Sequence, residues 1–191
     1  MASRHRLPIV RSSIMAVLLA LATMVALPPS TASAAPYCGI RWGSLDKDVS
    51  DVPAPRDRLD PQTGAVNVRA GQHPCYDRLV IDIGARGYTA SSGYTNQLRG
   101  GGSGLPLQVR GGAFLNIVIH DVTTPGSYTL ANPKPLSTAG FRTFREVVVT
   151  EDFEAVAAFG LGVRARLPFR MFILPGPGAG SRLVIDVAHR W

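Results

Sequence analysis

The sequence predicts an all-β protein, a β-sandwich of about seven to nine short strands with an extended N-terminal arm. Two observations lead to this fold class. Short segments with alternating apolar and polar residues are separated by glycine and proline, and no segment has a convincing helical period. One strand-like segment also occurs twice, before the middle of the chain and at its C-terminal end. This repeat indicates a sheet that joins an early strand to the last one.

The repeated segment covers Asp77–Ile83 and Ser181–Val187. In both copies one face is apolar, and the other face carries an arginine, a β-branched residue and an aspartate. Parallel in-register pairing of the two copies would place like charges side by side, whereas antiparallel pairing through the central valines places opposite charges together. We therefore expect antiparallel neighbours. The expected cross-strand ion pairs are Arg78 with Asp186 and Asp82 with Arg182.

Residues 1–34 have the pattern of a secretory signal peptide. Three arginines precede an apolar run from Ile14 to Leu27, and Ala32-Ser33-Ala34 fits the site of signal peptidase. The apolar run of about 14 residues is too short to span a bilayer. We expect a secreted mature chain without a transmembrane anchor, and a retained membrane anchor is the alternative.

The mature chain is only mildly basic. Loss of the three arginines of residues 1–34 leaves 17 basic against 13 acidic side chains, so the formal charge falls from +7 to +4. This excess does not establish nucleic-acid binding, and a secreted protein would rarely meet nucleic acid. We expect no nucleic-acid partner.

Residues 35–65 are expected to form the extended arm, because prolines and aspartates are frequent there and no periodicity is evident. Cys38 and Cys75 are the two cysteines of the chain. An even number of cysteines in an oxidising compartment favours a disulfide, which would attach the arm beside the first repeat strand. A cysteine nucleophile is the alternative, but no histidine partner is evident near either cysteine.

The domain is expected to cover residues 66–191. The Ser/Gly-rich segment Ser91–Gly104 predicts a loop. Alanine content favours a helix at Phe153–Phe159 and length favours a strand; we assign a strand. Pro168 interrupts the last segment before the second repeat, which favours an edge strand or a bulge there. Besides the repeats, strands are predicted at Val66–Arg69, from Tyr88, and at Leu105–Val109, Ala113–Val122, Arg145–Thr150 and Val163–Leu174.

Common catalytic signatures do not occur. The sequence has no His-Glu-x-x-His, Gly-x-Ser-x-Gly or Cys-x-x-Cys motif. The glycine-rich run Gly100–Gly104 lacks the Gly-Lys-Ser/Thr and the helix of a phosphate loop. His120 and Asp121 are adjacent, so they point to opposite faces of a strand. We expect a protein that is not an enzyme and has neither a metal site nor a cofactor, with a cryptic hydrolase as a remaining alternative.

The candidate ligand-binding surface is a row of arginines. Alternation from Val163 places Arg164, Arg166 and Arg170 on one strand face, and guanidinium groups suit carboxylates and phosphates. A solvated strand face is the alternative interpretation. Alternation also places Trp191 on the apolar side of the last strand, which favours its burial. The full candidate set adds Arg145, Tyr88 and Trp191 to the three arginines.

Three segments resemble the AMIN-like domain of secreted actinobacterial-type proteins. They are Val68–Pro74, Tyr76–Ile83 and Ser181–Val187, and Cys38–Leu45 is similar to the lead-in that those proteins carry. The resemblance covers about Val66 to Trp191. It implies a β-sandwich related to the AMIN domain, a non-catalytic module that targets some N-acetylmuramoyl-L-alanine amidases and secretin-type proteins to the cell envelope by contacting peptidoglycan.

We therefore expect a secreted, extracellular or wall-associated module that binds peptidoglycan or another cell-wall polymer. No amidase domain accompanies it in the sequence. The alternative is a secreted protein-protein interaction module that recruits a cell-wall enzyme or another partner through a sheet edge.

Overall fold

Nine antiparallel strands form two sheets in the part of the chain that the computed structural model describes, residues 38–51, 64–84, 86–122, 136–176 and 178–191. The predicted signal peptide lies outside the described residues. The five-stranded sheet has the order β1 (Lys47–Ser50), β4 (Thr89–Thr95), β5 (Ala113–His120), β7 (Val156–Val163) and β6 (Phe144–Phe153).

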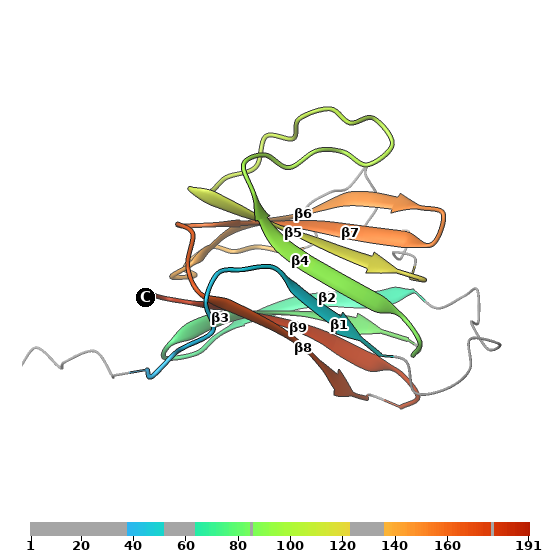
Figure 1. The fold of residues 1–191 in the computed structure, drawn as a ribbon, viewed down its shortest axis with the longest axis horizontal. Coiled ribbons are helices and arrows are strands. Elements are labelled where there is room, and N and C mark those ends of the chain that lie inside the picture. The colour runs from blue at the N-terminus through green and yellow to red at the C-terminus, as the bar shows by residue number, and fades with distance from the viewer. Residues whose placement is uncertain (1–37, 52–63, 85, 123–135, 177) are drawn as a thin grey trace, which may run out of the picture. The chain divides into compact units, whose positions relative to one another are not determined.

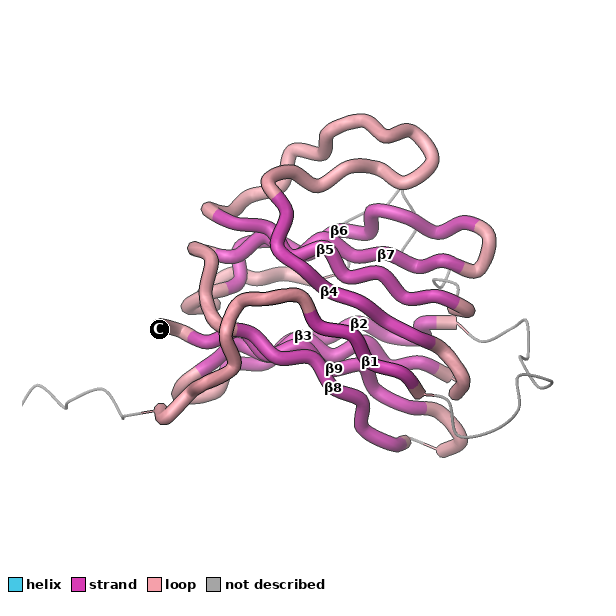
Figure 2. The backbone as a smooth tube through the Cα atoms, in the orientation of Figure 1, coloured by secondary structure: helices cyan, strands magenta, loops and turns pink. Residues whose placement is uncertain are grey.

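The second layer is a four-stranded sheet that packs face to face with the first (Figure 1). No helix occurs among the described residues (Figure 2). The predicted all-β sandwich is therefore confirmed. The order of the second sheet is β2 (Ala65–Gln72), β3 (Tyr76–Ile83), β9 (Ser181–Ala188) and β8 (Phe169–Pro175).

The core lies between the sheets and is built from the inward face of each alternating strand. Leu79, Ile81 and Ile83 of β3 are fully or almost fully buried, as the apolar face of the first repeat predicted. Burial of one such side chain contributes about 1.5–3 kcal/mol. The facing layer comes from β5, where Leu115, Ile117 and Ile119 are completely buried.

The two copies of the repeat pair antiparallel as β3 and β9, with Val80 opposite Val184. This register is the one that the charge pattern predicted. It places Arg78 opposite Asp186 and Asp82 opposite Arg182 in the centre of the four-stranded sheet. Leu79, Ile81 and Ile83 of β3 and Leu183, Ile185 and Val187 of β9 point inward, so these four charged residues, which have the opposite parity, lie on the outer face of this sheet.

The segment between β4 and β5 differs from its prediction. Thr89–Thr95 is a strand, although its serines and glycine predicted a loop from Ser91 onward. Leu105–Val109 is not a strand, and only Pro106 forms an isolated bridge, with Arg99. Residues 96–112 instead arch over the outer face of β6 and β7 (Figure 1).

Two glycines of β7 explain why this loop can lie flat on the sheet. A Cβ atom at Gly160 would meet the side chain of Leu98, and one at Gly162 would collide with the backbone of Arg110. The loop thus buries its own apolar residue Leu98 on the sheet without joining a strand. Within Leu105–Val109, Leu105 is 66% exposed, while Val109 lies over Gly162, so the alternation of this segment does not reflect a strand with one buried face.

The predicted long strand Val163–Leu174 is two strands in different sheets. β7 ends at Val163 in the five-stranded sheet, and β8 begins at Phe169 in the four-stranded sheet. Pro168 therefore stands in the connection between the sheets, just before a strand, where its missing N–H group is tolerated. β8 is an edge strand, as Pro168 favoured.

The described part of the predicted arm is tied to the sandwich. The Cys38–Cys75 disulfide is present, with a Cα–Cα distance of 5.7 Å. Lys47–Ser50 forms β1 and pairs with β4. The backbone carbonyl of Gly43 accepts a hydrogen bond of 2.8 Å from the backbone N–H of Phe169, which attaches the lead-in to the start of β8.

Candidate functional site

The outer face of the four-stranded sheet carries a grid of opposite charges, which we call the arginine face. Four arginines stand against two aspartates, so two positive charges remain. Every strand of the sheet contributes at least one member, because alternation exposes the polar side of each strand. The members are Arg69 of β2, Arg78 and Asp82 of β3, Arg182 and Asp186 of β9, and Arg170 of β8.

Asp186 is the centre of this face, and its side chain is completely buried. Arg78 donates from Nε to Oδ1 at 2.6 Å and from Nη2 to Oδ2 at 2.9 Å. Arg170 donates from Nε to Oδ2 at 2.8 Å. The hydrogen bond to Asp186 raises the pKa of Arg78 above its ordinary value. The predicted pair of Arg78 with Asp186 is confirmed, and a second arginine joins it.

Aromatic rings surround the guanidinium group of Arg170. Its central carbon lies 4.4 Å from the ring centroid of Trp42, 4.9 Å from that of Phe172 and 5.7 Å from that of Tyr76. His73 stacks on Tyr76 with 4.5 Å between the ring centroids. The rings are half-buried, so each still offers part of its surface to solvent. An arginine between rings is suited to bind a carboxylate that is attached to an apolar group.

Trp42 reaches this position through the lead-in rather than through a strand. The Cys38–Cys75 disulfide holds the chain four residues before it, next to the start of β3. Trp42 then meets Tyr76 edge to face, with 5.5 Å between the ring centroids. The tether therefore brings a distant ring to the arginine face.

Asp82 has a different partner from the one predicted. Arg69 binds both of its oxygens at 2.9 Å, while Arg182 donates to the backbone carbonyl of Pro175. The hydrogen bond from Arg69 lowers the pKa of Asp82 below its ordinary value. The predicted ion pair of Asp82 with Arg182 is thus wrong as a contact, although the two residues are opposite in register. A hollow of about 450 Å³ is lined by Arg69, Asp82, Gly176 and Arg182, and the charge of Arg182 also contributes to the lowered pKa of Asp82.

The predicted row of Arg164, Arg166 and Arg170 does not lie on one strand. The first two stand in the connection between β7 and β8, and only Arg170 belongs to β8. Arg164 donates to the carbonyl of His189. Arg166 donates to the Oγ and carbonyl of Ser44 and covers the ring of Tyr94 at 5.0 Å. The row was wrong because the chain changes sheets between Val163 and Phe169.

The other predicted ligand residues are scattered. Arg145 is the second residue of β6 and donates to the carbonyls of Phe141 and Phe144. Tyr88 is buried, which raises the pKa of its hydroxyl to about 12, and this hydroxyl accepts a hydrogen bond from Ser181. Tyr88 is therefore part of the core rather than of a surface.

Trp191 is 72% exposed, so the predicted burial is wrong. β9 ends at Ala188, and the alternation that would bury the ring does not continue beyond it. The indole Nε1 donates to the carbonyl of Arg166 at 3.1 Å. Trp191 therefore lies near Arg166 and not among the residues of the arginine face.

The sequence analysis did not include the aromatic residues around Arg170, which are Trp42, Tyr76 and Phe172, in the candidate ligand set. Tyr76 has the same parity as Arg78 along β3, and Phe172 has the same parity as Arg170 along β8. Residues of the same parity lie on the same face of a strand, so alternation could have placed both rings beside these arginines. The place of Trp42 follows from the disulfide and a backbone hydrogen bond, which no periodicity shows.

The described residues hold no group of three or more His, Cys, Asp or Glu side chains with the geometry of a metal site. None of the described segments is a helix of the length and apolar character needed to cross a bilayer. Both findings concern the described part of the chain alone.

Fold and surface together define a β-sandwich module with a cationic, ring-lined outer face. The family model of the AMIN-like domain matches residues 63–189. The chain therefore belongs to the AMIN-like domain family, as the repeat and its flanking segments indicated. The match includes β2 to β9, so it covers the arginine face apart from Trp42. No curated protein matches the chain.

Family membership indicates a module that is related to the cell envelope. The Cys38–Cys75 disulfide agrees with a compartment outside the cytoplasm, because disulfides persist in oxidising surroundings.

Proposed function

We propose that this protein is a secreted, non-catalytic module that binds peptidoglycan through the arginine face. The observation that carries the proposal is the environment of Arg170. Its side chain is 39% exposed, it shares the buried carboxylate of Asp186 with Arg78, and aromatic rings flank it. A guanidinium group that is already oriented loses little freedom when it binds a ligand.

The chemistry of peptidoglycan matches this surface. Its stem peptides carry carboxylates, which an arginine fork binds with charge-assisted hydrogen bonds. Its sugars have apolar faces that can pack on exposed rings, such as those of Trp42 and Phe172. Because four arginines stand against two aspartates, the face attracts an anionic polymer before contact.

A non-catalytic role is supported by the state of the two acids on this face. Asp186 and Asp82 each accept hydrogen bonds from arginine, so neither is arranged as a base toward a reacting group. Secretion is supported by the signal-like sequence of residues 1–34 and by the disulfide. Arg164, Arg166 and Trp191 lie outside the arginine face, so we assign them no direct part in binding the wall polymer.

The proposal is tested by sedimentation of residues 35–191 with purified peptidoglycan at low ionic strength. Arg170→Gln should reduce retention several-fold, because it removes the oriented fork while Asp186 keeps Arg78. Arg99→Gln is the matched control, since it removes the same charge from the loop between β4 and β5 of the other sheet and should bind like the parent.

Two results would contradict the proposal. The first is that the parent protein does not sediment with the wall even at low salt, which would favour the alternative of a module that recruits a protein partner. The second is that Arg170→Gln and Arg99→Gln bind the wall equally well, which would place the wall contact on another surface.

A further inference from the structure

The end of the sandwich where β7 passes into β8 gathers arginines from three segments. The backbone N–H of Arg164 donates to the carbonyl of Thr143 at 2.8 Å, which brings the segment before β6 to the β7–β8 connection. The N–H of Gly112 donates to the carbonyl of Val163 at 2.8 Å, which brings the end of the β4–β5 loop to the same place. We call this end the basic pole. Its exposed arginines are Arg110, Arg142, Arg164 and Arg166.

Two large apolar side chains are exposed on either side of Arg166. The carbonyl of Arg166 accepts a hydrogen bond of 3.1 Å from the indole Nε1 of Trp191, which is 72% exposed (Figure 1). Its Nη2 group donates at 3.1 Å to the carbonyl of Ser44, and the next residue, Leu45, is 76% exposed. Exposed apolar side chains gathered in one region of a surface mark a contact with a protein or a membrane.

The charge of the basic pole is cationic because the acids that it contacts are buried. Glu146 is buried and accepts a hydrogen bond of 2.7 Å from the backbone N–H of Arg110, whose Nε lies 3.5 Å from the same carboxylate. Arg164 and Arg166 donate to carbonyl groups, which leave their positive charges uncompensated. Asp46 is exposed after Leu45, but its carboxylate lies over the strand β4.

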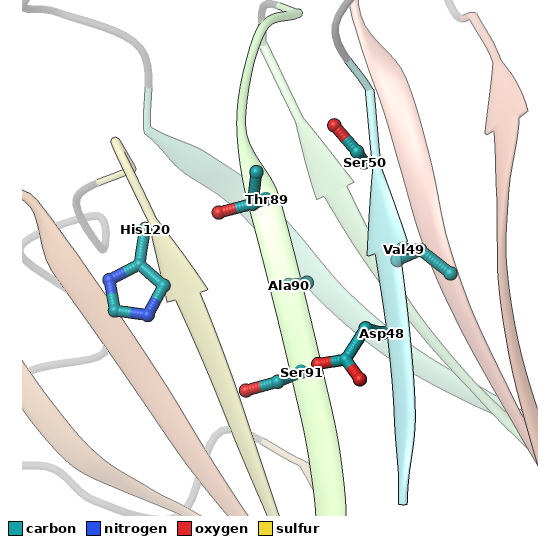
Figure 3. A pocket seen from close by; sticks show the side chains of 7 residues that line it. All are labelled: Asp48, Val49, Ser50, Thr89, Ala90, Ser91 and His120. Atoms are coloured by element: carbon teal, nitrogen blue, oxygen red, sulfur yellow. The ribbon is translucent and has the colours of Figure 1, made fainter.

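Exposed acids lie at the other end of the same strands. Glu154 stands in the turn before β7, and the N–H of the residue after Asp121 donates to the carbonyl of Ala155 in this turn. Asp48 lines a hollow with His120, the last residue of β5, towards this end (Figure 3). β7 has 8 residues, so about 25 Å separates the turn from the basic pole, which exceeds a screening length of about 8 Å.

An anionic bilayer suits the basic pole better than other partners. Its arginines exclude a cationic ligand. The hollow beside Arg166 measures about 250 Å³, below the roughly 300 Å³ of ordinary small-molecule sites. Protein interfaces have an apolar centre that is depleted of charge, whereas here charges of one sign adjoin Trp191 and Leu45. Cations beside tryptophan and leucine are the composition of segments that lie on membranes, where the long arginine side chain reaches phosphates and the ring enters the head-group layer.

We infer that the basic pole binds the surface of an anionic phospholipid bilayer. Trp191 and Leu45 enter the head-group layer, and Arg142, Arg164 and Arg166 contact lipid phosphates. The site goes beyond the proposed function, because the arginine face is built from other residues and takes carboxylates of the wall.

Sedimentation of residues 35–191 with lipid vesicles tests the inference. The protein should bind vesicles of equal parts phosphatidylglycerol and phosphatidylcholine at least about tenfold more tightly than vesicles of phosphatidylcholine alone, and added salt should weaken the binding. Each charge near the surface changes the affinity about fivefold, so Arg142→Glu, which changes the charge by two units, should weaken binding at least about tenfold. Arg99→Glu is the matched control, because Arg99 is an exposed arginine of the β4–β5 loop outside the basic pole.

A second pair of variants tests the apolar contact. Leu45→Ser should weaken binding to the anionic vesicles several-fold. Leu105→Ser is its matched control and should bind like the parent, because Leu105 is a leucine that is 66% exposed on the β4–β5 loop. The variant Trp42→Phe leaves Trp191 as the only tryptophan of residues 35–191. Its emission should move to shorter wavelength on the vesicles and be quenched by brominated acyl chains.

Thermal unfolding of each variant checks that the sandwich is intact. The inference is overturned if the parent does not bind the anionic vesicles, or if folded Arg142→Glu binds them as the parent does. Binding that leaves the emission of Trp191 unchanged and is insensitive to Leu45→Ser would also overturn it, since the pole would then be a general polyanion site. Arg170→Gln should bind the vesicles like the parent, so this result is separate from wall binding; a loss there would place the lipid contact on the arginine face instead.

Discussion

Asp186 is a buried charge whose stability depends on two arginines of unequal importance. Arg78 contacts both of its oxygens, whereas Arg170 contacts one and is more exposed. We expect Arg78→Gln to lower the free energy of unfolding by about 2 kcal/mol, because it leaves a buried carboxylate half-paired. Arg170→Gln should cost less than about 1 kcal/mol.

Urea titrations of the two variants measure this difference. Equal losses for both, or a larger loss for Arg170→Gln, would contradict the assigned roles. A small effect at Arg170 also matters for the binding test, because it keeps the fold intact while the exposed fork is removed.

Asp82 makes the stability depend on pH in the acid range. Arg69 lowers its pKa in the folded protein, so the folded state binds this proton more weakly than the unfolded chain. The resulting stabilisation is complete above the ordinary carboxyl pKa of about 4 and is lost as the pH falls through the lower folded value.

Asp82→Asn removes this stabilisation. Because Arg69 is half-exposed, we expect a loss of about 1 kcal/mol at neutral pH. The difference between parent and variant should shrink below about pH 4. Urea titrations at a series of pH values measure it, and a difference that stays constant down to about pH 2, well below the ordinary carboxyl pKa, would refute this account.

An individual contact could be predicted from the sequence only where the register of a single pair of strands determines it. The charge order of the repeat was sufficient for the contact of Arg78 with Asp186, since these residues belong to the neighbouring strands β3 and β9. The partner of Asp82 depended on β2, where Asn67 lies opposite Asp82 and Arg69 reaches it from two residues further along the strand. The repeat covers β3 and β9 alone and carries no information on β2, so the sequence left Arg69 unassigned.

At the scale of elements, the turn between β6 and β7 has an unusual sequence. Glu154 and Ala155 are its two central residues, and both have positive φ, at 50° and 59°. This geometry is that of a type I′ turn, which asparagine and glycine adopt with less strain. The double substitution Glu154→Asn with Ala155→Gly should raise the free energy of unfolding by about 1 kcal/mol.

A thermal unfolding comparison with the parent tests the turn. A lower midpoint for the double variant would show that Glu154 or Ala155 makes a contact worth more than the relief of backbone strain. The same residues explain why the boundary was hard to place: the alanine content of this stretch favours a helix, and the turn lacks its usual glycine.

Elements with strict alternation were predicted, and elements shaped by the other sheet were not. The alternation of β5 and of both repeats reflects one buried face, which a local pattern records. The break between Val163 and Phe169 is a change of sheet, and the loop over Gly160 and Gly162 is a tertiary contact. Both features depend on packing between distant segments. The alternating residues of Val163–Leu174 and Leu105–Val109 were therefore predicted to be strands.

At the scale of the whole molecule, the two sheets present outer faces of different chemistry. The four-stranded sheet exposes arginines and rings around Asp186, and the five-stranded sheet exposes Asp46, Asp48, Ser91 and Asn116 around one hollow. The fold could be predicted from the sequence, while this division of surfaces required the arrangement of both sheets.

The central claim is that the arginine face binds the carboxylates of peptidoglycan. The most direct measurement is an NMR titration of labelled residues 35–191 with a soluble muropeptide that keeps its stem-peptide carboxylates. The account predicts that the signals of the Trp42 indole N–H and of the Arg78 and Arg170 Nε–H groups shift with saturation, and that the shifts shrink as salt is added. Saturable shifts that leave these three signals unchanged would contradict it, as would the absence of any shift.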